Sequence, residues 1–262
     1  MTTPANRREL SKAPLSLALC QIKFSPIRTM ASYVPQVQDA QRKDGYRLDL
    51  SGKVQEVTFG PQGAQAQVFD RWEFLNVAKT RSVVITEQFA AYQTSEYATF
   101  DEFLPKVLHL MDALTKAGAD VLITRVGLRH VHAIVPSAGK TWRDYLVPSL
   151  HGTQSPVLSH AMMAHHVFGS TASGRMLARI SQNTEGLLVP VELAQQNLTP
   201  VREPPAAETT VTLIDIDHFK EWTEHFTDYE PEALHRLVRN LRNDIYTVFC
   251  SFVTEAAIKE WS

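Results

Sequence analysis

The sequence has few of the residues that mark secreted or membrane-spanning proteins. It contains only two cysteines in 262 residues, Cys20 and Cys250, both among apolar neighbours. This favours buried thiols in a reducing compartment over a disulfide framework. Residues 1–11 are polar and lack the apolar centre of a signal peptide. Because no stretch approaches about eighteen uninterrupted apolar residues, we expect no membrane span and a cytoplasmic protein.

The sequence also lacks an excess of charge of either sign. Its 26 basic and 28 acidic residues give a formal net charge of −2, so no overall field attracts nucleic acid or an anionic membrane. With 44% hydrophobic and 21% charged residues, the composition is typical of a globular chain. Single cores stop growing at roughly 250 to 300 residues, so we predict one α+β domain over residues 1–262, with 12–135 and 136–262 as its two halves.

Common catalytic and metal-binding motifs are absent as well. The chain has no Gly-x-Ser-x-Gly, no phosphate-binding or dinucleotide-binding glycine loop, no His-Glu-x-x-His and no Cys-x-x-Cys. Ten histidines occur, and His130 with His132 on one strand face would suit a first-row metal if a third ligand joined them. The spacing dictates no third ligand. We therefore predict no structural zinc, no cofactor and no disulfide.

Hydrophobic periodicity and turn residues predict a mainly antiparallel sheet packed by two long helices. One strand is predicted at residues 15–24, and three or four more lie between 55 and 97, with a turn at 60–63. The other predicted strands cover residues 120–135, 157–167, 175–180, 187–191 and 211–216. The predicted helical segments cover residues 30–43, 99–118, one turn at 142–146, 231–252, and a short helix after 254. Residues 199–208, with three prolines, are predicted to form a loop.

Two of these helices carry clear end signals. Thr99 and Glu102 form a predicted capping box, and Gly118 stands where a left-handed C-terminal residue is expected. Pro231 lies in the first turn of the last long helix, with Thr227 or Asp228 as its predicted N-cap. Strands in runs, with helices before or after them, favour α+β over alternating βαβ units, and the order of elements suggests a pseudo-repeat of two halves.

Charged residues interrupt two of the predicted strands. With a period of two, Arg125, Gly127 and Arg129 share one strand face, and His130 and His132 share the other. An arginine in a largely apolar strand needs a carboxylate or a bound anion, because an unpaired buried charge is very costly. Gly127 between the two arginines leaves room for a close backbone approach or for a ligand.

The nearest carboxylates of the right kind are Asp215 and Asp217, which project from one strand face about 7 Å apart. They could end a strand and begin a turn, form a salt-bridge network, or hold a metal or divide acid and base work. We predict that each of Arg125 and Arg129 pairs with one of these aspartates across neighbouring strands.

Short motifs spread over nearly the whole chain resemble a sporadically distributed bacterial family of uncharacterised proteins of about this length. The motifs are Ala13-Pro14-Leu15, Arg125-Val-Gly-Leu-Arg129, Leu213-Ile-Asp-Ile-Asp217, Leu234-His235 and Thr254-Glu255. The resemblance selects Arg125, Gly127, Arg129, Asp215, Asp217 and His235 as site residues, although this chain has His130 where a tyrosine is more usual. It brings no activity and no cofactor. Patchy distribution implies accessory genes such as toxin–antitoxin or phage-defence cassettes.

Two hypotheses of function follow. The first is a non-enzymatic binding or interaction protein whose partner is another protein, with a homo-oligomer also considered. The second is an enzyme or ligand-binding protein that acts on an anionic small molecule through a pocket containing Arg125, Arg129, Asp215, Asp217 and His235. Nucleic-acid binding through a basic face of the last helix is disfavoured by the balanced charge; this face comprises His235, Arg236, Arg239 and Arg242.

Overall fold

The computed structural model describes residues 10–60, 63–153, 157, 162–194, 197–206 and 208–262, and the side chains of these residues outside 55–60 and 63–67. The strands are β1 (Leu15–Phe24), β2 (Leu48–Asp49), β3 (Gly52–Gly60), β4 (Gly63–Leu75), β5 (Arg81–Ile85), β6 (Phe89–Thr94), β7 (Leu122–Ile134), β8 (Ala164–Ser170), β9 (Arg175–Asn183), β10 (Val211–Glu221) and β11 (Thr227–Asp228). The α-helices are α1 (Met30–Lys43), α2 (Phe100–Lys116), α3 (Val191–Ala194), α4 (Pro231–Phe252) and α5 (Glu255–Trp261).

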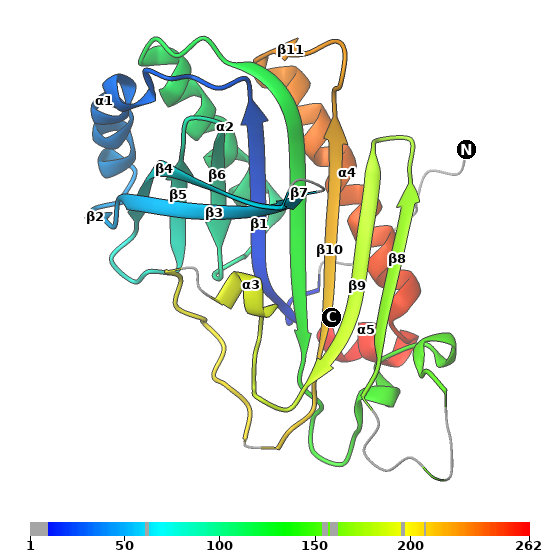
Figure 1. The fold of residues 1–262 in the computed structure, drawn as a ribbon. Coiled ribbons are helices and arrows are strands. Elements are labelled where there is room, and N and C mark those ends of the chain that lie inside the picture. The colour runs from blue at the N-terminus through cyan, green and yellow to red at the C-terminus, as the bar shows by residue number, and fades with distance from the viewer. Residues whose placement is uncertain (1–9, 61–62, 154–156, 158–161, 195–196, 207) are drawn as a thin grey trace.

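The protein is an α+β protein built on one large antiparallel sheet. The strand order is β2-β4-β5-β6-β1-β7-β10-β9-β8, while β3 pairs only with β4 and β11 pairs with β7. The sheet therefore runs through both halves of the chain, with β1 and β7 side by side at its centre (Figure 1). The division into two halves and their pseudo-repeat stay predictions. No helix in the described part of the chain has the length and apolar composition needed to cross a bilayer.

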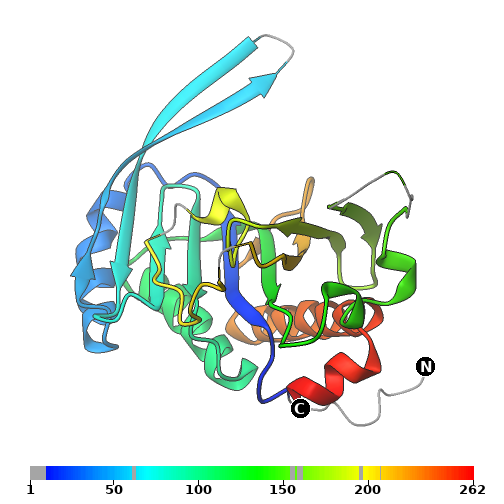
Figure 2. The ribbon, with the colours of Figure 1, turned by 90° about the horizontal axis from the view of Figure 1, so that it is seen from below.

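The two faces of the sheet are covered differently. Helices α1, α2, α4 and α5 lie on one face, and the short α3 and the β3–β4 hairpin lie on the other (Figure 2). We call these the helix face and the open face. The β3–β4 hairpin extends away from the rest of the sheet as a two-stranded arm.

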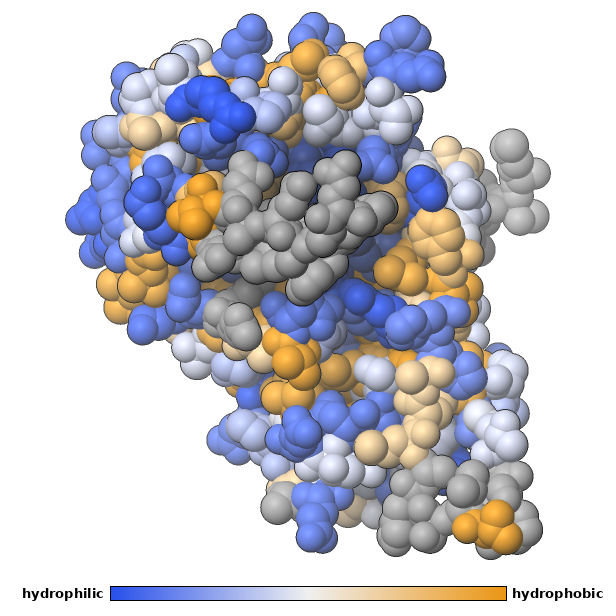
Figure 3. All heavy atoms as spheres, viewed as in Figure 1, coloured by the Kyte–Doolittle hydropathy of each residue, from blue (hydrophilic) through white to orange (hydrophobic). Residues whose placement is uncertain are grey.

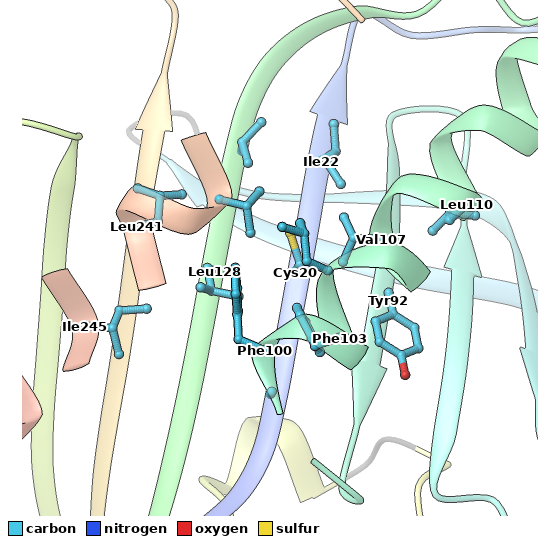
Figure 4. Close-up of a cluster of buried hydrophobic side chains, with 14 of the residues drawn as sticks. Cys20, Ile22, Tyr92, Phe100, Phe103, Val107, Leu110, Leu128, Leu241 and Ile245 are labelled. Carbon is cyan, nitrogen blue, oxygen red and sulfur yellow. The ribbon is translucent and has the colours of Figure 1, made fainter. Parts of the chain in front are cut away.

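The hydrophobic core lies between the sheet and the long helices. Alternate residues of β1, including Cys20 and Ile22, point into it, because successive strand side chains point to opposite faces (Figure 4). Helix α2 contributes Phe103 and Val107, and α4 contributes Ile245. The 3.6-residue period of both helices places their apolar side chains on this one side.

Local signals account for most of these elements. The Thr99 hydroxyl accepts a hydrogen bond from the Glu102 amide at the start of α2, and Gly118 has a φ of 101° after its end. Pro231 begins α4, and Thr254 caps α5. The predicted hairpin is present as β8 and β9, but its first strand begins at Ala164 and not at residue 157; residues 158–161 lie outside the described part of the chain.

Three expectations about local structure are wrong. Residues 187–191 do not form a strand; Pro190 has no amide to donate to a sheet, and Leu188 and Leu193 instead cover the open face. Thr227 and Asp228 do not cap α4, because they form β11; the N-cap is Glu230. Asp215 and Asp217 do not end a strand, since β10 continues to pair with β7 as far as Glu221.

The buried and exposed sides of α4 predict a large difference in stability between two alanine variants. Ile245 is buried, so Ile245→Ala should lower the free energy of unfolding by about 2 to 5 kcal/mol. The exposed Arg239 pairs with Asp101 at 3.2 Å, and Arg239→Ala should cost under about 1 kcal/mol. Urea denaturation of both variants measures the difference. Equal losses would mean that Ile245 does not support the core.

Candidate functional site

Charged side chains from β7, β10 and β9 meet on the open face. Arg129 of β7 stands opposite Asp217 of β10, and Asp215 of β10 stands opposite Arg179 of β9. Directly opposed residues of antiparallel strands share a sheet face, so the register brings these side chains together. Figure 3 shows hydrophilic residues on this side of the molecule, next to the arm.

Asp215 lies at the centre of this cluster. Arg129 donates from Nε to Oδ1 and from Nη2 to Oδ2, both at 2.7 Å, which is the bidentate geometry of a strong arginine–carboxylate pair. Arg179 donates from Nε to Oδ2 at 2.9 Å, and its Nη2 lies 2.7 Å from the same oxygen in an ion pair. The Asp215 side chain is only 3% exposed, so two guanidinium groups hold one buried carboxylate.

Glu192 of α3 covers this trio from the open face. Its Oε1 accepts from Arg129 Nη2 at 2.9 Å and lies 3.5 Å from Arg179 Nη2. Burial raises the pKa of Glu192, but the hydrogen bonds and charges of its arginine partners outweigh this and lower the pKa below its usual value. Glu192 therefore stays ionised and completes the pairing.

Arg125 forms a second ion pair, with Asp217, on the same face of the sheet. Its Nη2 donates to Asp217 Oδ2 at 3.1 Å, and Nη1 donates to Gln21 Oε1 at 3.4 Å. The guanidinium carbon lies 4.3 Å from the centre of the Phe219 ring. A Cβ on Gly127 would lie 2.8 Å from Arg125 Nη1, so the space over Gly127 is filled by Arg125. The room expected there for a ligand is taken by the protein itself.

Burial and pairing shift the pKa values of this cluster in opposite directions. Burial lowers the pKa of Arg129, but its hydrogen bonds to Asp215 and Glu192 and their charges raise the pKa by more. For Asp217, burial raises the pKa, and the charges of Arg125 and Arg129 offset only part of this.

The cluster is closed by its own pairing. Three guanidinium groups, on Arg125, Arg129 and Arg179, face three carboxylates, on Asp215, Asp217 and Glu192. Each predicted arginine has an aspartate partner on the neighbouring strand, as expected. Across the described residues, no group of three or more histidine, cysteine or carboxylate side chains is placed to hold a metal ion.

The structure does not bring His235 to this cluster. His235 belongs to α4, which packs on the helix face, while the arginines and aspartates project from the open face. His130 and His132 point to the helix face as well, and their rings contact Tyr97 and Phe249. The six residues that the resemblance selects therefore lie on two sides of the sheet.

Sequence reasoning missed two members of the cluster. Arg179 alternates with buried residues of β9 in the same way that Arg125 and Arg129 do in β7, and this alternation was a usable signal. Glu192 gave no signal, since it directly follows residues 187–191, which were predicted as a strand, and no element was predicted at its own position. Its position depends on α3, a four-residue helix that the sequence does not mark.

A cavity of about 380 Å³ lies beside the cluster. Gln21 and Lys23 of β1 line it together with the aromatic rings of Phe69, Phe89 and Phe226. Gln21 also accepts from Arg125, but none of the paired arginines and aspartates lines the cavity itself. The charged cluster is therefore not part of the wall of this cavity.

Comparison with models of protein families found no matching family, and comparison with curated proteins found no match.

Proposed function

We propose that the protein is a non-enzymatic binding protein whose partner is another protein, and that an extended segment of this partner pairs with strand β8. The arginine–carboxylate cluster supports the first part, because its charges satisfy one another and leave no group poised for acid–base chemistry or anion binding. A bacterial, cytoplasmic accessory system of toxin–antitoxin or defence type is the setting that the family resemblance implies.

The observation that carries the proposal is the exposed edge of the sheet at β8. This strand is the last in the sheet order, and among the described residues its one strand partner is β9. Its Val167 is 50% exposed and its Phe168 is 58% exposed. Natural edge strands are usually protected from pairing with another chain by a lysine, a proline or a covering helix. Strand β8 contains no lysine and no proline. An exposed edge with apolar side chains suits the addition of a partner strand.

The charges around β8 indicate the chemistry of that strand. Neither β8 nor β9 contains an acidic residue, and β8 carries His165 and His166. Arg175 of β9 lies over the ring of Phe168, with its guanidinium carbon 5.0 Å from the ring centre. A partner strand that alternates apolar and acidic side chains would complement this edge.

A lysine in the edge strand tests the proposal. Val167→Lys should weaken partner binding by about tenfold or more and leave the melting temperature within about 2 °C, because a lysine on an edge opposes strand addition but removes no core contact. Val77→Lys is the matched control, since Val77 is 69% exposed in the β4–β5 turn and away from the edge. The partner is isolated from the native host with wild-type protein and then titrated, purified, against each variant.

The same titrations separate the alternatives. Equal affinity of the Val167→Lys and wild-type proteins for the partner would overturn the β8 edge as the binding surface. Loss of self-association in sedimentation of Val167→Lys would identify the partner as a second copy of the chain. The ligand-binding hypothesis would be favoured instead if the wild-type protein turned over or tightly bound an anionic metabolite. In that case Asp217→Asn should abolish the turnover or binding and leave the melting temperature of the protein unchanged.

A further inference from the structure

The β3–β4 arm has no third strand beside it in the described part of the chain. Its two strands pair with each other from Gly52 opposite Arg71 to Gly60 opposite Gly63, and β5 joins β4 only from Trp72 onward. Figure 2 shows the arm projecting from the body of the protein. A two-stranded ribbon is at best marginally stable in water, and three or more strands are normally needed. The arm therefore calls for a further strand from outside its own chain.

The two strands of the arm differ in how they oppose pairing with another chain. Strand β3 carries Lys53 and Glu56, and charged residues on an edge strand hinder the addition of a further strand. On β4, residues 63–69 contain no charged residue and no proline. Over this stretch the one strand neighbour of β4 among the described residues is β3, and Val68 is 59% exposed. The free edge of β4 is therefore the edge open to strand addition.

The absence of charge on this edge suits a second copy of the same chain. Two copies of one strand pair antiparallel about a two-fold axis, so residues near the axis stand opposite themselves or each other. A charged residue at the axis would meet a like charge, which destabilises a directly opposed pair. An axis through Ala66, the middle residue of 63–69, avoids this. With a rise of roughly 3.3 Å per residue, the two copies of Asp70 are then about 26 Å apart along the strands.

We propose that the protein forms a two-fold symmetric dimer in which the β4 strands of two arms pair antiparallel through residues 63–69. The pairing makes a four-stranded sheet in the order β3-β4-β4-β3, which supplies the neighbour that each arm lacks. Backbone N–H groups on this edge donate to carbonyl groups of the other copy, as in any antiparallel ladder. Strand β8 ends the sheet on the side away from β4, so the dimer leaves both β8 edges free.

A lysine at the proposed axis tests the dimer. The wild-type protein should sediment as a dimer at micromolar concentration, and Ala66→Lys, which sets two lysines opposite each other, should raise the dissociation constant about tenfold or more. Thr58→Lys on β3 is the matched control, since Thr58 pairs with Gln65 within the arm. The two β3 strands are about 14 Å apart across the four-stranded sheet, beyond the Debye length at physiological salt, so this control should leave the dimer unchanged.

A cysteine at the same position tests the axis without weakening the contact, and it serves if Ala66→Lys does not fold. Directly opposed residues of antiparallel strands have Cα atoms about 4.5 to 5.5 Å apart, within the range of disulfides. Mild oxidation should therefore join two chains of Ala66→Cys into a covalent dimer on a non-reducing gel. Thr58→Cys should stay uncrosslinked, as should the wild type, whose Cys20 is buried and Cys250 half-buried.

Three results would each overturn the arm-to-arm dimer. The first is a wild-type protein that sediments as a monomer at micromolar concentration. The second is an Ala66→Cys protein that forms no more covalent dimer than Thr58→Cys. The third is a dimer that Val167→Lys dissociates and Ala66→Lys does not, which would assign self-association to the β8 edge instead.

Discussion

Asp215→Ala is expected to lower the free energy of unfolding by about 3 to 5 kcal/mol, the loss typical of removing one partner from a buried ion pair. Asp215 accepts four short contacts from Arg129 and Arg179, and its side chain is almost fully buried. Without it, Glu192 is the remaining carboxylate within reach of both guanidinium groups, and Glu192 is half exposed. Urea denaturation at neutral pH measures the loss.

Asp217→Asn provides the matched comparison on the same strand face. Asp217 is 25% exposed, makes one hydrogen bond of 3.1 Å to Arg125, and keeps an amide oxygen as acceptor after the substitution. We expect it to cost about 1.5 to 3 kcal/mol, because a hydrogen bond to a charged group contributes about that much. If Asp215→Ala proves no more costly than Asp217→Asn, the cluster does not contribute to stability as a buried network.

This pair of variants also separates a structural cluster from a binding one. If the cluster is structural, the loss of stability in each variant increases with the burial of the carboxylate that is changed. Asp215→Ala should then destabilise the protein more than Asp217→Asn. A binding cluster would lose ligand or partner affinity while the melting temperature changes little. The first outcome is the one that the closed pairing predicts.

The sequence predicted those parts of the fold that depend on local signals. Helix α2 has its cap at Thr99 and its terminating glycine at Gly118, and α4 has Pro231 at its first position, so their bounds were close to the observed ones. The period of two placed Arg125 and Arg129 on the face opposite His130 and His132, which the structure shows. Such features need only neighbouring residues to be recognised.

Features that depend on contacts between distant segments could not be predicted in the same way. Glu192 reaches Arg129 across 63 positions because Leu193 packs on the open face, and no local pattern marks that contact. The unpartnered nitrogens of His130 and His132 are likewise invisible in the sequence, since they depend on where α4 and the segment before α2 lie. The open edge at β8 follows from the strand order, which period alone does not give.

The buried histidines are expected to make the protein lose stability as the pH falls below about 6.5, the usual pKa of histidine. Burial lowers the pKa of His132 from 6.5 to about 3, partly opposed by a hydrogen bond with the Ile214 backbone, and burial also lowers the pKa values of His130 and His218. Between the two pKa values the unfolded chain binds the proton and the folded chain does not. Stability is therefore complete above pH 6.5 and decreases as the pH falls toward 3.

His132→Phe isolates the contribution of one histidine. Each buried neutral histidine adds up to about 1.4 kcal/mol per pH unit to the slope of unfolding free energy below its unfolded pKa, so the wild type should lose stability more steeply than the variant by that amount. Phenylalanine keeps the stacking on Phe249 and removes the titrating ring nitrogens. Urea denaturation from pH 7 to pH 5 measures the slopes. Parallel slopes for the wild type and His132→Phe would show that His132 is protonated in the folded protein, in contradiction to its burial among Phe249, His130 and Ile214.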